Sequence, residues 1–123
     1  MTQAHASLWY GIAPKGHTLG RKGFPIIVEN YLDSLGEGDN LWGIAHDIVS
    51  AHGVELVYHG YQDDDERVGL APLGALVTVN DLLVVQPLVV QPEWDMKVVS
   101  AAQALKWPGP FVLNWYLSVR VNW

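Results

Sequence analysis

The C-terminal segment 111-FVLNWYLSVRVNW-123 alternates between two kinds of residue more regularly than any other part of the chain. Every odd position is aromatic or aliphatic, whereas four of the six even positions are Asn, Ser or Arg. Successive side chains of a strand point to opposite faces of a sheet, so this alternation predicts one long strand with one buried face. We expect Leu113, Trp115, Leu117 and Val119 to be buried on that face.

Three segments upstream carry the apolar spacing of amphipathic helices. In 25–35 the apolar side chains recur with the 3.6-residue helical period, and 41–52 shows the cleanest stripe of this kind, with Asn40 in the position of an N-cap. The segment 93–107 has a third apolar stripe, and the prolines of 108-PGP-110 must end that helix.

The remaining apolar segments are typical of strands. Segments 7–13, 54–61 and 75–79 are rich in aromatic or β-branched residues. The order of elements predicts an α+β fold in a single domain, residues 1–123. We expect a mixed or mainly antiparallel sheet of about five strands, with two to three helices on one face.

The segment 82-LLVVQPLVVQ-91 is the most apolar of these candidate strands. Proline has no N–H to donate, so Pro87 and Pro92 place this segment at the edge of a sheet or at a bulge. An apolar edge that nothing covers invites pairing with another chain. We therefore expect a homodimer.

Composition limits the class of protein. Half of the 123 residues are apolar and 16% are charged, which argues against disorder. Cysteine is absent, so neither disulfides nor thiolate chemistry is available, as is common in a reducing compartment. The first residues lack the pattern of a signal peptide, and the longest apolar stretch, 82–90, is too short to span a membrane. We expect a cytoplasmic protein.

The charge of the chain is negative and unevenly distributed. A net charge of −6 disfavours direct binding to nucleic acid or to an anionic membrane surface. Ten acidic residues and no Lys or Arg lie between Gly23 and Glu66. This window predicts an acidic surface for a basic partner protein. The residues expected to form that surface are Glu29, Asp33, Asp63, Asp64, Asp65 and Glu66.

The same acidic residues allow an alternative, a small hydrolase or a metal-dependent enzyme. Such an enzyme would use histidines together with Asp47 or with the acidic turn 63–66. His46 and Ser50 are four residues apart on a predicted helix and can meet, although no orienting acid is evident. The turn lacks the spacing of an EF-hand calcium loop, and H-E-x-x-H and G-x-S-x-G are absent. We assign no catalytic residue, metal or cofactor.

A second alternative is a small-anion binder. Three of the seven basic residues fall in the glycine-rich segment 15–23, which precedes a predicted helix. Glycines let backbone N–H groups approach an anion, although the P-loop spacing is missing here. The residues of this candidate anion-binding loop are Lys15, Gly16, His17, Gly20, Arg21 and Lys22.

Overall fold

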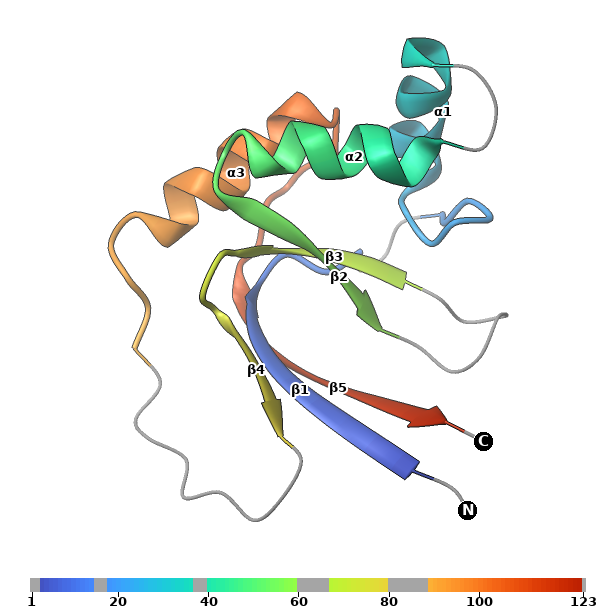
Figure 1. Cartoon of the computed structure of the whole chain (residues 1–123). Helices are drawn as coiled ribbons and strands as arrows, with labels where there is room; N and C mark the ends of the chain where they lie inside the picture. The colour runs from blue at the N-terminus through green and yellow to red at the C-terminus, as the bar shows by residue number, and fades with distance from the viewer. Residues whose placement is uncertain (1–2, 15–17, 37–39, 60–66, 80–88, 123) are drawn as a thin grey trace.

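The computed structural model describes residues 3–14, 18–36, 40–59, 67–79 and 89–122 (Figure 1). Three helices and five strands form within these ranges. Their bounds are β1 (Gln3–Gly11), α1 (Ile26–Leu35), α2 (Leu41–Ser50), β2 (Val54–His59), β3 (Arg67–Pro72), β4 (Leu76–Val79), α3 (Trp94–Ala104) and β5 (Asn114–Asn122).

The strands form two antiparallel sheets. A three-stranded sheet has the order β4-β1-β5, and β2 and β3 form a separate hairpin. The α+β class is thus confirmed, but the expectation of a single sheet is wrong. Ile12, just past the end of β1, forms one isolated bridge with Leu70 of β3, with both N···O distances at 2.9 Å. Backbone pairing between the end of β1 and the hairpin is therefore limited to this one bridge and does not continue as a ladder.

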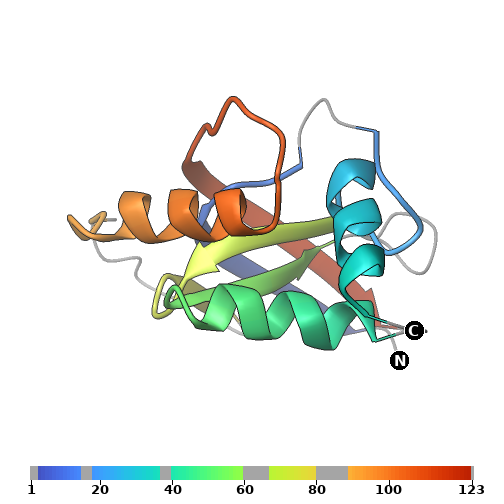
Figure 2. The ribbon, with the colours of Figure 1, turned by 90° about the horizontal axis from the view of Figure 1, so that it is seen from above.

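The β2–β3 hairpin is the middle layer of the molecule. The three helices lie on one side of it, and the β4-β1-β5 sheet lies on the other (Figure 1). Seen from the helix side, α2 and α3 flank the hairpin while β1 and β5 cross behind it (Figure 2). A hairpin covered on both faces has to bury both faces, which explains why β3 is buried along its length from Val68 to Pro72.

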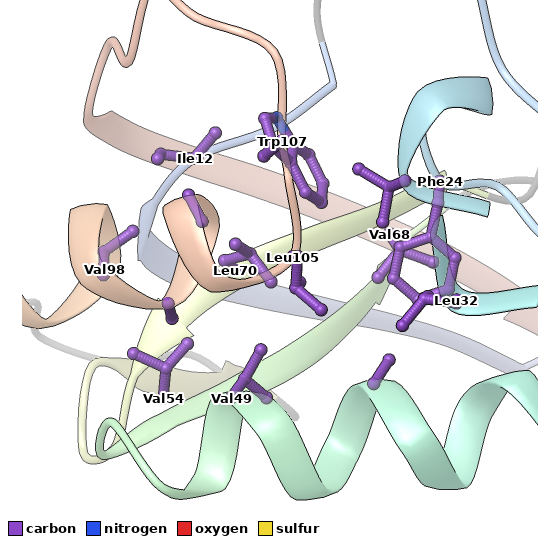
Figure 3. Close-up of a cluster of buried hydrophobic side chains, with 14 of the residues drawn as sticks. Ile12, Phe24, Leu32, Val49, Val54, Val68, Leu70, Val98, Leu105 and Trp107 are labelled. Atoms are coloured by element: carbon purple, nitrogen blue, oxygen red, sulfur yellow. The ribbon is translucent and has the colours of Figure 1, made fainter. Parts of the chain in front are cut away.

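The main core lies between the helices and the hairpin (Figure 3). Val54, Val68 and Leu70 contribute the hairpin side of this core, and the helices contribute aliphatic and small residues that exclude solvent. The helix residues of this cluster are Val28, Leu32, Leu41, Ala45, Val49, Val98, Ala101 and Ala102. The 3.6-residue stripes of the sequence are the faces buried here.

A second, smaller core lies on the opposite face of the hairpin. Trp9 of β1 is completely buried against Val57 and Ala71, and its ring stacks on Tyr116 of β5 with the centroids 4.8 Å apart. This aromatic pair belongs to the three-stranded sheet, and it packs against the hairpin at Val57 and Ala71, where the two sheets share no backbone pairing.

The outcome for the C-terminal strand is mixed. A strand does form, over Asn114–Asn122, but Leu117 is 67% exposed and the expectation that it would be buried is wrong. The even-numbered Tyr116 faces the second core instead. Trp115, on the other face, is half-buried beside Tyr10 and Trp94. Trp94 of α3 covers this face of β5 at Trp115. Leu117 lies two residues further along the edge strand, and among the described residues it remains exposed.

The middle of the chain differs in detail from the expectation. Residues 67–79 form two short strands, β3 and β4, divided by a turn in which Gly74 adopts a φ of 90°. Asn40 precedes α2, but its side chain makes no capping hydrogen bond. Most of the predicted 82–91 strand, residues 82–88, lies outside the described residues, and Val89 and Val90 are exposed.

Candidate functional site

The glycine-rich loop before α1 is organised around the side chain of Glu29. The backbone N–H groups of Lys22 and Phe24 both donate to Glu29 Oε2, at 3.1 and 3.2 Å. A Cβ at Gly20 would collide with the same carboxylate, so only glycine lets the backbone pass so close. The anion that these backbone donors hold is therefore an internal one.

This arrangement changes the interpretation of Glu29. The residue is only 8% exposed, so it does not contribute to an acidic surface. Burial raises the pKa of its carboxyl above the usual value of 4.5, while the hydrogen bonds from Lys22 and Phe24 oppose that rise. Glu29 is a structural carboxylate that fixes the loop 20–24 to the first turn of α1.

The rest of the candidate anion-binding loop is divided between described and undescribed residues. Lys15, Gly16 and His17 lie outside the described residues. Arg21 is exposed and Lys22 is half-buried, so their side chains are available to an external anion even though the backbone donors are occupied. Binding of an external anion by these two side chains stays a prediction.

Other acidic residues of the Gly23–Glu66 window are scattered over two faces. Asp33 on α1 and Asp47 on α2 are exposed. Glu55 is half-buried on β2, where it alternates with the core residues Val54 and Leu56 and so belongs to the opposite face of the hairpin. Asp63, Asp64, Asp65 and Glu66 lie outside the described residues.

Basic residues from outside the window approach it in the folded chain. The ammonium of Lys106 lies over the ring of Tyr31 on α1, 5.6 Å from the centroid. The stem of Lys97 lies against Gly53, where a Cβ would be 3.5 Å from Lys97 Cδ. The segment 23–66 contains no Lys or Arg, but in the folded chain Lys106 and Lys97 lie close to it.

The outward face of α1 combines aliphatic and acidic side chains. Ile26, Ile27 and Leu35 are all large apolar residues left exposed by a helix of ten residues. Ile26 and Asp33 are seven residues apart, which places them within about 20° of each other around the helix axis, whereas Ile27 lies about 120° and Leu35 about 160° from Asp33. Solvated helix faces are normally polar, so this face has the composition of a contact surface.

The groups proposed for catalysis do not form a site among the described residues. His46 Nδ1 lies 3.6 Å from Asp47 Oδ1, but both side chains are largely exposed and water screens the pair. No three His, Asp or Glu side chains gather as metal ligands anywhere in the described ranges. The enzyme alternative gains no geometric support from this part of the chain.

One polar contact was not foreseen from the sequence. The hydroxyl of Tyr10 on β1 donates to Asp95 Oδ1 on α3 at 2.7 Å, across 85 positions of sequence. Burial, followed by the hydrogen bond and charge of Asp95, raises the pKa of Tyr10 to about 12. Tyr10 also packs against Trp94 and Trp115, which makes an aromatic cluster between α3 and the three-stranded sheet. The pairing of β1 with β5 and the packing of α3 bring these residues together, so no local sequence pattern predicts the contact.

Comparison of the chain with protein-family models, with curated proteins and with solved structures finds no match. No helix in the described part of the chain is both long and apolar enough to cross a membrane. The surface and the cavities of the described residues are therefore the basis for assigning a function.

Proposed function

We propose that this chain is a non-enzymatic interaction module that presents an acidic surface to a basic partner protein. The observation that carries the proposal is the surface of α1, where Ile26 and Ile27 are exposed and Asp33 lies on the same side of the helix as Ile26. Protein interfaces combine an apolar centre with a polar rim, and this face offers both on one short helix.

The neighbouring acidic groups determine the chemistry of the partner. Asp47 on α2 is exposed, and the α1–α2 connection contains Glu37 and Asp39. The turn 63–66 adds four further carboxylates in the sequence. A partner with Lys or Arg around an apolar patch is complementary to this composition, whereas nucleic acid and anionic lipid are repelled by it.

The partner surface is smaller than the sequence alone indicates. Glu29 is buried in the loop 20–24, and Glu55 lies on another face. The proposal therefore rests on Asp33 and on Asp63, Asp64, Asp65 and Glu66, together with the aliphatic residues of α1.

A peptide selection tests this proposal without a known partner. A random peptide library is selected against the chain, and the enriched peptides are titrated by calorimetry. We expect peptides that combine Lys or Arg with apolar residues. Their binding should weaken when salt is raised from about 50 to about 300 mM, because screening shortens the reach of charge.

Matched variants locate the surface on the molecule. Ile27→Ser should weaken peptide binding at least about fivefold, as expected for a central apolar contact. Met96→Ser on α3 is its control, since Met96 is 72% exposed and Ile27 is 54% exposed. Asp33→Asn should lower the salt dependence, while Glu93→Gln should not. Enrichment of uncharged peptides, or equal binding by Ile27→Ser and Met96→Ser, contradicts the proposal.

A further inference from the structure

A hollow of about 250 Å³ lies beside the end of β1, away from the surface of α1. Its walls come from the bridge segment after β1 and from the chain between α3 and β5. The lining residues are Ile12, Ala13, Trp107, Pro110, Val112, Asn114 and Tyr116. None of them is charged.

The indole of Trp107 supplies an unsatisfied hydrogen-bond donor in this wall. Trp107 is buried, and its Nε1 has no hydrogen-bond partner. The six-membered ring points toward Phe24 and Val68 in the main core, and the nitrogen lies at the opposite end of the indole (Figure 3). A buried donor without an acceptor costs free energy, so natural proteins leave one only where something else satisfies it.

We infer that this hollow binds a small, neutral, flat molecule that carries one hydrogen-bond acceptor. The acceptor takes the N–H of Trp107, and the body of the molecule lies among Ile12, Pro110 and Val112. An ionised ligand is excluded by its chemistry, because a charge buried among uncharged residues loses hydration without a counter-charge. The volume is below the range of about 300–1,000 Å³ typical of drug-sized ligands, so the ligand is smaller than these.

Access to the nitrogen involves the segment 108–113. This segment belongs to no helix or strand, and Val112 is exposed at the mouth of the hollow. Because Nε1 itself is buried, the inference requires Pro110 and Val112 to move outward when the ligand binds. Asn114, which is exposed on the same wall, is available to a second polar group of the ligand.

Benzamide is a suitable probe, because it is neutral and flat and has a carbonyl acceptor. Binding is followed in the NMR spectrum through the indole N–H signals of the six tryptophans, with the Trp107 signal assigned from Trp107→Phe. We expect a saturable shift of the Trp107 signal with benzamide. Toluene lacks the acceptor and benzoate carries a charge, so each should bind about tenfold more weakly or not at all.

Two similarly exposed apolar residues provide a matched pair of variants, since Val112 is 57% exposed and Leu73 is 59% exposed. Val112→Phe should fill the mouth of the hollow and abolish the benzamide shift, whereas Leu73→Phe, outside the hollow, should leave it unchanged. Both substitutions are at exposed positions, so they test the site without removing a core residue. A Trp107 signal that does not respond to benzamide overturns the inference. Equal binding of benzamide and toluene, or equal behaviour of Val112→Phe and Leu73→Phe, does so as well.

Discussion

Gly69 of β3 lies directly against the indole of Trp9, so that a Cβ at this position would be 2.9 Å from Cζ3 of Trp9 and closer still to Cη2. Trp9 is fully buried in the second core, where Val57, Ala71 and Tyr116 surround it. The absence of a side chain at Gly69 is what makes room for the largest residue of that core. This fit is one of the contacts between the hairpin and the three-stranded sheet, in addition to the Ile12–Leu70 bridge.

We therefore predict that Gly69→Ala destabilises the protein by about 1–3 kcal/mol, the usual effect of overpacking a dense core. The free energy of unfolding is measured in urea. Gly109→Ala is the control, because a Cβ there would meet no atom within 4 Å. An unchanged stability in Gly69→Ala would mean that Trp9 does not pack against β3 as described.

Removal of the Glu29 carboxylate should release the loop 20–24. In Glu29→Ala the N–H groups of Lys22 and Phe24 lose their acceptor, and each buried donor left unsatisfied costs about 1–3 kcal/mol. Hydrogen exchange at Phe24 should accelerate strongly. Glu29→Gln keeps an oxygen in the same place and should be affected less.

The Glu29→Ala variant also allows chemical rescue. Added acetate is a carboxylate of suitable size to occupy the vacated position, and it should raise the melting temperature of Glu29→Ala by mass action. Glu29→Gln should gain little from acetate, since the position is filled. If acetate stabilises the two variants equally, the loop does not hold Glu29 as an internal anion.

These two sites show what the sequence could and could not predict. The three helices were located to within a few residues, because a stripe of apolar residues reports a buried helix face wherever that face packs. The strand 111–123 was recognised for the same reason. The alternation does not show which layer covers each face of the strand, however, and so the prediction that Leu117 is buried is wrong. The fit of Gly69 to Trp9 depends on residues 60 positions apart, and no local pattern encodes it.

The loop 15–23 shows a different limit of sequence interpretation. Its glycines predict that backbone can approach an external anion, and at Gly20 the backbone does lie close to a carboxylate, because the residue has no Cβ. The sequence did not show that the anion is Glu29, nine residues further on in α1. A count of charges along the sequence has a similar limit. Lys106 and Lys97 are far from the acidic window in sequence, and the packing of α3 places them beside it in the folded chain.

Glu55 should make stability fall as pH rises above its ordinary pKa. Burial raises the pKa of Glu55 above 4.5, so in that window the folded state binds more protons than the unfolded state. The free energy of unfolding then decreases with rising pH, and the stability contributed by protonated Glu55 is lost as pH passes the folded pKa. Urea unfolding from about pH 4 to about pH 7 measures this slope.

Glu55→Gln should make the slope less negative, because the variant no longer titrates at this position. Glu29 contributes in the same direction, so the comparison is between variant and parent and not with a flat profile. Exposed Glu93→Gln is the matched control. A Glu55→Gln protein with the parental pH profile would show that Glu55 does not lose hydration on folding.

The assembly state is the last prediction, and two exposed apolar positions test it. The valine-rich segment 82–91 predicts a homodimer, and its described end exposes Val89. Leu117 on the edge strand β5 is also apolar and is similarly exposed, at 67% against 62% for Val89, but it lies on another element.

Light scattering at high micromolar concentration should report a dimer for the parent chain and for Leu117→Asp. Val89→Asp should be a monomer, because a buried unpaired carboxylate is costly at an apolar interface. Neither substitution should change monomer stability by more than about 0.5 kcal/mol, as is usual at exposed positions. A monomeric parent would end the prediction. A dimer disrupted only by Leu117→Asp would place the contact on the three-stranded sheet and contradict the assignment to 82–91.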